Sequence, residues 1–255
     1  MVLRDLIRRT WMKRALELGI FVRFCLGQTI DSQQMIYIDA ENTVNNDILV
    51  FDTFYDAYYN LSLKTRETLR HFELHRSHSI PTIYVWTNTD GFVVPDRLVQ
   101  FFDQYQVAGG RNEIHGQCTC YGTVSFCAQS DGPDVMRDGK WAMAYAIWRP
   151  EHYPHHCMGY TVVFGPNTPK RLLALANQAS VRWLRENWID DVTYTGIYRE
   201  TAKLKMLPAP FEVLPPPEDT LWPQPGPRSP IAAYHTMGEA QPDFYLALWR
   251  AVRGE

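Results

Sequence analysis

The alternation of short apolar runs with amphipathic stretches is the feature that most constrains the fold. Residues 21–27 and 47–52 are short, rich in β-forming residues, and end at residues that break or cap structure, as buried strands do. Residues 60–76 instead carry apolar side chains at helical spacing with charged side chains between them. Strands that alternate with helices favour a layered α/β sheet over a sandwich or a helix bundle.

The same alternation continues along the chain. It predicts further strands at 83–86, 142–148 and 160–164, and further helices at 97–105 and 169–186. The chain has 255 residues, of which 45% are hydrophobic, and this is enough to build the core of one large domain.

Prolines mark a change of organisation after Lys205. Nine of them fall between Pro208 and Pro230, a density that neither a helix interior nor a central strand tolerates. We therefore predict a main domain over residues 1–206 and an extended proline-rich linker over 207–230. The apolar pattern that returns in 231–255 predicts a C-terminal segment that packs back on the main domain.

The charge balance argues against two classes of partner. The chain has 25 Lys and Arg against 28 Asp and Glu, a net charge of −3, which provides no basic surface for nucleic acid or an anionic membrane. No window approaches the ~18 to 20 apolar residues that a membrane helix requires. We expect no nucleic-acid partner and no membrane span in this chain.

The five cysteines leave more than one possibility open. Cys118 and Cys120 are separated by one residue, unlike the two to four residues of a zinc knuckle, and no matching pair follows. Disulfides and buried thiols both remain possible for these two and for Cys25, Cys127 and Cys157. Because the count is odd, at least one thiol stays unpaired within the chain.

Four blocks, in a fixed order, resemble a known family. They are Arg4 with Ile7-Arg8 and Thr10-Trp11; Asp47-Ile48-Leu49 through Asn60-Leu61-Ser62; Tyr84 to Val93; and Lys140-Trp141 through Tyr153-Pro154 to Ile189-Asp190-Asp191-Val192. This order is similar to that of the family 31 glycosyltransferases, which include β1,3-galactosyl- and β1,3-N-acetylglucosaminyltransferases. The resemblance implies a divergent member with an α/β, GT-A-like nucleotide-sugar-binding domain, a mixed sheet flanked by helices.

The third block contains the metal motif of the family in altered form. Where the family has three consecutive aspartates, this chain has Asn88, Thr89 and Asp90. The resemblance implies that Asp90 and His235 bind Mn²⁺ or another divalent cation, and that Asn88 contacts the ribose of a UDP-sugar donor. Asp90 follows a predicted strand, where open α/β sheets gather ligands. A simple turn at Asp90 and an ordinary surface histidine at His235 remain alternatives.

Two further residues are candidates for binding the donor. Arg8 is predicted as a cation on the donor side, although a salt bridge on a helix surface explains it equally well. Gly159 lets the backbone approach the sugars where a side chain would not fit. His155 and His156 are predicted to be loop residues that face solvent or acceptor.

The adjacent carboxylates of Asp190 and Asp191 are the candidate catalytic pair. An inverting transfer needs one general base that removes the proton from the acceptor hydroxyl. The resemblance to the acidic motif of the family favours Asp191 as this base and Asp190 as its support. The alternative is an acidic pair that only solvates a helix end.

These features predict an inverting glycosyltransferase that moves galactose or N-acetylglucosamine from a UDP-sugar to a glycan acceptor in β1,3 linkage. The alternative is a catalytically impaired relative with a glycan-binding or chaperone-like role, which the replacements at Asn88 and Thr89 favour. Family members are anchored in the membrane by an N-terminal helix that is not seen before Met1, so we expect a truncated chain or a soluble relative. Asn60-Leu61-Ser62 is an N-glycosylation sequence, which agrees with a place in the Golgi lumen.

Overall fold

The computed structural model describes residues 2–77, 79, 82–107, 112–214, 225–236 and 242–255. Its strands are β1 (Phe24–Gln28), β2 (Ile48–Tyr55), β3 (Tyr84–Thr87), β4 (Gly91–Val93), β5 (Glu113–Cys118), β6 (Cys157–Phe164), β7 (Lys205–Pro208), β8 (Phe211–Leu214) and β9 (Ala233–Thr236). Its α-helices are α1 (Val2–Ile7), α2 (Lys13–Glu17), α3 (Ser32–Asn45), α4 (Leu61–His75), α5 (Pro95–Val107), α6 (Val124–Cys127), α7 (Thr168–Ala176), α8 (Val181–Glu186), α9 (Tyr198–Thr201) and α10 (Pro242–Arg253). The remaining helical segments are the π-helical η1 (Arg8–Met12) and η3 (Val192–Ile197) and the 3₁₀ turn η2 (Tyr58–Asn60).

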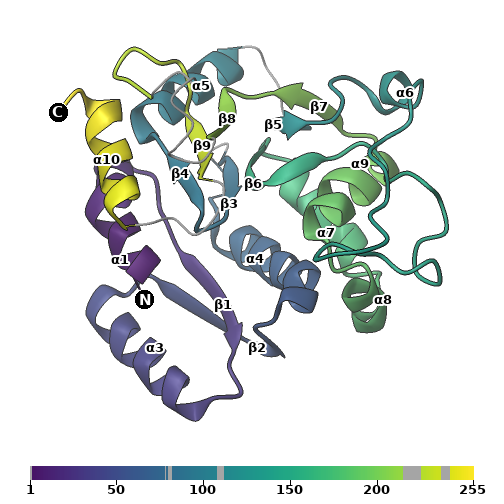
Figure 1. Cartoon of the computed structure of the whole chain (residues 1–255), viewed down its shortest axis with the longest axis horizontal. Helices are drawn as coiled ribbons and strands as arrows, with labels where there is room; N and C mark the ends of the chain where they lie inside the picture. Colours follow the sequence, from purple (N-terminus) through teal and green to yellow (C-terminus); the bar gives the residue numbers. More distant parts are fainter. Residues whose placement is uncertain (1, 78, 80–81, 108–111, 215–224, 237–241) are drawn as a thin grey trace.

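The strands pair in three groups that mix parallel and antiparallel neighbours. β1 pairs with β2 in parallel, the order β3-β6-β5-β7 is antiparallel except for β5 with β7, and the order β4-β9-β8 is antiparallel between β4 and β9. Figure 1 shows α1 and α10 on one side of these strands and α7, α8 and α9 on the other. The predicted fold class, an α/β domain with mixed pairing and flanking helices, is confirmed.

Most predicted elements are present. The strands predicted at 21–27, 47–52, 83–86 and 160–164 correspond to β1, β2, β3 and β6, and the helices predicted at 60–76 and 97–105 correspond to α4 and α5. The helix predicted at 169–186 is wrong in its continuity, because it is divided into α7 and α8. The Ser180 side chain accepts a hydrogen bond from the backbone of Trp183 and thereby starts a second helix.

The strand predicted at 142–148 is also wrong, because this stretch is an irregular loop. The Arg137 guanidinium donates hydrogen bonds to the carbonyl oxygens of Met143 at 2.8 Å, Trp148 at 2.8 Å and Pro150 at 2.7 Å. A single half-buried cation therefore satisfies backbone acceptors that a strand would have offered to a neighbouring strand. We call residues 133–150 the Arg137 loop.

The proline-rich segment begins as strand. β7 ends at Pro208, β8 follows directly, and β8 pairs in parallel with β9 from the C-terminal segment. Residues 215–224 of the predicted linker lie outside the described residues, so its boundaries stay a prediction. After β9 the chain continues into α10, which contacts α1 (Figure 1). The Trp11 indole donates a hydrogen bond to the hydroxyl of Tyr245 in α10.

The apolar core has two large parts and one small one. One large part joins α1, β4, β9 and α10, and the other joins α4, β5, β6, α7 and α8. The small part contains Val135, Met143, Tyr153, Trp188 and Val192. It packs the Arg137 loop against the chain segment on either side of the predicted acidic pair.

Four of the five cysteines form disulfides. Cys118 pairs with Cys157, its register partner across β5 and β6, and Cys120 pairs with Cys127. Cys25 keeps a free thiol, and burial raises its pKa to about 12. Within the described ranges, the helices are all too short or too polar to cross a membrane.

Candidate active site

Strand pairing brings Asp90 and His235 together. Gly91 of β4 lies opposite His235 of β9, and Asp90 directly precedes β4. The backbone nitrogen and the hydroxyl of Thr236 donate to the carbonyl oxygen of Asp90, at 3.0 and 2.8 Å. As a result, the His235 Nε2 atom lies 3.3 Å from the Asp90 Oδ2 atom.

The second carboxylate oxygen of Asp90 differs from the first. Oδ1 is buried and has no hydrogen-bond partner within the described structure. A buried oxygen in that state is costly unless another group binds it. Carboxylate oxygen with imidazole nitrogen is a donor set that fits Mn²⁺. The described residues supply no cluster of three or more such ligands, so the remaining ligands of an ion here would be oxygen atoms of substrate or water.

Tyr160 of β6 lies against the same pair. Its ring stacks on the His235 imidazole, with centroids 4.8 Å apart and planes at 7°. Its carbonyl oxygen accepts a hydrogen bond from the Asn88 backbone at 3.0 Å, and its hydroxyl donates to Gln117 at 2.9 Å. The Asn88 side chain is exposed at the turn between β3 and β4.

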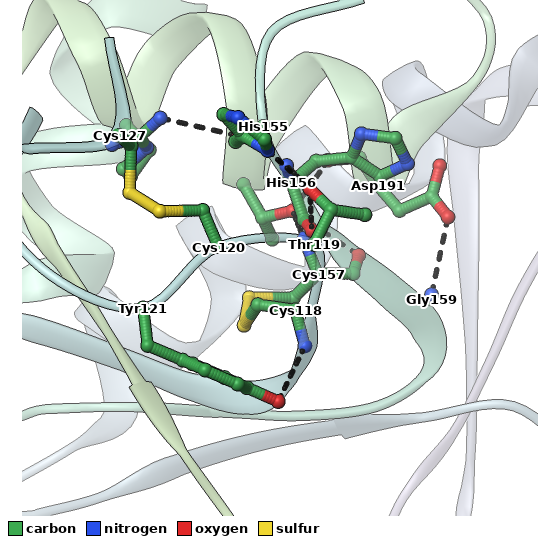
Figure 2. The surroundings of a disulfide bond; sticks show 12 residues. Cys118, Thr119, Cys120, Tyr121, Cys127, His155, His156, Cys157, Gly159 and Asp191 are labelled. Atoms are coloured by element: carbon green, nitrogen blue, oxygen red, sulfur yellow. Dashed lines mark hydrogen bonds between the residues drawn. A yellow bond between two sulfur atoms is a disulfide. The ribbon is translucent and has the colours of Figure 1, made fainter. Parts of the chain in front are cut away.

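The preceding residue of β6, Gly159, contacts Asp191. Figure 2 shows the Asp191 carboxylate directed at the Gly159 backbone, whose N–H donates to Oδ2 at 3.1 Å. Oδ1 accepts from the backbone of Val192 at 2.8 Å. A β-carbon at Gly159 would lie 3.3 Å from Asp191 Cβ and Oδ2, so glycine permits this approach. Two neighbouring residues of β6 therefore link Asp191 to the Asp90–His235 pair.

Asp190 is held on the other side of the acidic pair. Its Oδ2 atom accepts a hydrogen bond from the Thr65 hydroxyl of α4 at 2.9 Å. Burial, and next the negative charge of Asp191, raise the pKa of Asp190 to about 7. Both aspartates stand in the first turn of the helical run 190–201, where the helix dipole favours negative charge.

A disulfide-linked strand supports the backbone of Asp191. The Thr195 hydroxyl donates to the Asp191 carbonyl oxygen at 2.6 Å and accepts from the backbone N–H of Cys157 at 2.8 Å. Cys157 is cross-linked to Cys118 of β5, directly beside this contact (Figure 2). Thr195 lies in the π-helical segment η3, an irregularity that is frequent near functional sites.

The side chains of Arg8 and His155 are bonded to protein groups other than the candidate site residues. The Arg8 guanidinium forms ion pairs with Asp47 and with Glu41, each at 2.7 Å, and the bond to Asp47 raises its pKa. A donor contact by Arg8 stays a prediction, and it requires this group to exchange partners. The solvent-facing position predicted for His155 is wrong, because the side chain is buried and bonds to the Thr119 hydroxyl at 2.9 Å.

Sequence reasoning missed the residues that position the carboxylates, namely Thr65, Tyr160 and Thr195. Thr65 and Thr195 are polar residues at buried helical positions, but other polar residues such as Ser62 and Thr193 are buried beside them, so their signal in the sequence is weak. Tyr160 carried no comparable signal, since aromatic residues are ordinary in a buried strand.

Comparison with known proteins decides the family. A family model described as galactosyltransferase matches residues 3–210, which include every candidate residue except His235. The chain belongs to the galactosyltransferase family. This galactosyltransferase-family chain is 27% identical over 213 residues to Beta-1,3-galactosyltransferase 2 of Homo sapiens, covering 82% of the chain and 46% of the relative.

Two other relatives give the same picture. Beta-1,3-galactosyltransferase 5 of Homo sapiens is 24% identical over 205 residues, which are 80% of the chain and 60% of the relative. Beta-1,3-galactosyltransferase 1 of Mus musculus is 28% identical over 163 residues, which are 63% of the chain and 46% of the relative. The chain thus spans about half the length of the curated relatives it matches.

Proposed function

We propose that this chain is an inverting glycosyltransferase that moves galactose or N-acetylglucosamine from a UDP-sugar to a glycan acceptor in β1,3 linkage. One observation carries the proposal: Gly159 and Tyr160, neighbours on β6, contact Asp191 and His235 respectively. Sugar transfer needs a base at the acceptor and neutralised charge at the leaving group at the same moment. Groups suited to the two tasks thus contact successive residues of one strand.

Asp191 has the role of the base. The acceptor oxygen attacks the anomeric carbon, its proton passes to the Asp191 carboxylate, and the bond from that carbon to the diphosphate oxygen breaks. The backbone N–H groups of Gly159 and Val192 each occupy one lone pair of the carboxylate, which fixes its orientation and leaves other lone pairs free. Asp190 supports it, since a carboxyl whose pKa is raised to about 7 carries less charge against Asp191.

The donor side is formed by Asp90, His235 and Asn88. A divalent cation such as Mn²⁺, held by Asp90 and His235, would supply the positive charge that a leaving diphosphate needs. The exposed amide of Asn88 hydrogen-bonds the donor ribose without adding charge. The buried, unpartnered Asp90 Oδ1 atom supports this assignment.

We also infer that the protein works in the Golgi lumen. Its two disulfides support an oxidising compartment, because such bonds are rare where thiols are kept reduced. The Asn60 acceptor sequence fits the same compartment. Asn60 is partly exposed, and its side-chain amide donates a hydrogen bond to the Tyr55 carbonyl at 2.8 Å.

An array of UDP-sugars and acceptor glycans, with and without Mn²⁺, tests the proposal by measuring UDP release and the linkage formed. We expect release that requires an acceptor and increases with Mn²⁺. Turnover that ignores the acceptor would instead indicate a hydrolase. Absence of turnover with every donor would favour the second candidate function, a glycan-binding relative, for which the replacements at Asn88 and Thr89 already speak.

A further inference from the structure

Exposed aromatic side chains border the acidic pair. Tyr58 of η2 and Trp141 of the Arg137 loop are 37% and 45% exposed. The Tyr58 ring packs on Trp188, with centroids 4.9 Å apart, and Trp188 is buried two residues before Asp190. The Lys140 Nζ atom lies 4.9 Å from the centroid of the Tyr58 ring and 5.0 Å from that of Trp141. We call Tyr58, Trp141 and Trp188 the aromatic wall.

The aromatic wall lies within reach of the proposed catalytic carboxylates. Burial raises the pKa of Tyr58, and the charges of Asp191, Asp190 and Asp90 add to this increase against the opposing effect of Trp141. The Tyr58 hydroxyl therefore lies in the field of all three carboxylates. The chain connectivity also places Tyr58 near Asp190, because η2 leads directly into α4, whose Thr65 hydroxyl donates a hydrogen bond to Asp190.

The chemistry of the wall selects its ligand. Large aromatic side chains that stay exposed beside a functional site mark a binding surface. An aromatic ring has a negative face, which attracts the weakly positive C–H groups on one face of a pyranose. Lys140, whose ammonium lies over the Tyr58 and Trp141 rings, adds three donors for the hydroxyl groups that edge such a sugar once its flexible side chain moves aside. Neutral sugar rings combine the apolar face and polar edge that this arrangement fits.

We propose that Tyr58 and Trp141 form the surface on which a sugar ring of the glycan acceptor stacks, beside Asp191. The inference rests on the proposed function and names its acceptor subsite. The wall packs through Trp188, two residues before Asp190, whereas His235 stands on β9 and Asp90 directly precedes β4. The stacked ring thus lies where its hydroxyl reaches the base.

Glycan binding measured without donor tests the wall separately from catalysis. A glycan array of the wild-type protein comes first, followed by saturation-transfer NMR titration of N-acetyllactosamine, a probe that contains both galactose and N-acetylglucosamine. Trp141→Ala and Tyr58→Ala should each raise the Kd for N-acetyllactosamine about tenfold, as expected for one lost aromatic contact. Trp141→Phe keeps a ring and should retain most of the affinity.

Tyr37→Ala is the matched control, because Tyr37 is 54% exposed on the remote helix α3 and should not affect glycan affinity (Figure 1). UDP binding, measured by calorimetry with Mn²⁺ present, should be the same in all variants. The inference is overturned if the wild-type protein binds no glycan, if Trp141→Ala binds N-acetyllactosamine like wild type, or if it weakens UDP binding instead. A protein that binds glycan through the wall but transfers no sugar would refute the proposed function and leave the wall standing.

Discussion

Replacing Asp190 by asparagine tests the electrostatics of the acidic pair. Asparagine keeps the shape of the side chain and can still accept the hydrogen bond that Thr65 donates at 2.9 Å, but it cannot ionise. Burial and the neighbouring charge of Asp191 raise the pKa of Asp190 from 3.8 to about 7. The folded protein therefore binds this proton more tightly than the unfolded chain does.

The size and sign of the effect follow from this difference. The stability that the protonated carboxyl contributes is complete below pH ~4 and is lost as pH rises through ~7. One pKa unit corresponds to about 1.4 kcal/mol, so ionising folded Asp190 costs about 4 kcal/mol in full. Between pH 5 and pH 8 the loss amounts to about 2 to 3 kcal/mol.

Urea unfolding at pH 5 and at pH 8 measures this loss of stability. The free energy of unfolding of Asp190→Asn, relative to that of wild type, should be higher at pH 8 than at pH 5 by about 2 to 3 kcal/mol. Asp103→Asn, at an exposed position on α5, is the control and should follow wild type. If Asp190→Asn also follows wild type at both pH values, Asp190 ionises freely and the electrostatic account of the pair is refuted.

Three further changes probe the supports of Asp191. Gly159→Ala should reduce sugar transfer about tenfold while sparing the fold, because the new β-carbon displaces the Asp191 carboxylate; rates beside thermal melting will show this. The double change Cys118→Ser with Cys157→Ser should lower the free energy of unfolding by about 2 to 5 kcal/mol in urea titrations. Arg137→Ala should speed hydrogen exchange across residues 138–150, and unchanged exchange there would contradict its role in holding the loop.

The local hydrophobic pattern predicted those strands and helices that carry a clear pattern in their own residues. β1, β2, β3 and β6 are short apolar runs, and α4 and α5 show helical periodicity. Helix α3 escaped because none of its side chains is buried, which leaves no apolar stripe to detect; its signals are the cap at Asp31 and the left-handed Asn46. Strand β9 escaped because it is stabilised by pairing with β4 and β8, which are distant in sequence.

For the candidate site, the sequence likewise predicted some features and not others. The resemblance pointed to Asp90, Asp190, Asp191 and His235 by residue type and order. It did not give the contacts that position them, since Thr65 bonds Asp190 across 125 positions and His235 meets Asp90 across 145. Contacts of this kind depend on how strands and helices pack, and a single sequence carries no local pattern for them.

Asp191→Asn tests the central claim most directly, with donor binding and transfer measured on the same preparation. A base acts only when the acceptor hydroxyl loses its proton, so the account predicts UDP-sugar affinity near that of wild type and transfer reduced by ~10² to 10⁴-fold. Asp190→Asn, measured beside it, should cost less. Full transfer by Asp191→Asn, or loss of transfer in Asp190→Asn alone, would contradict the account.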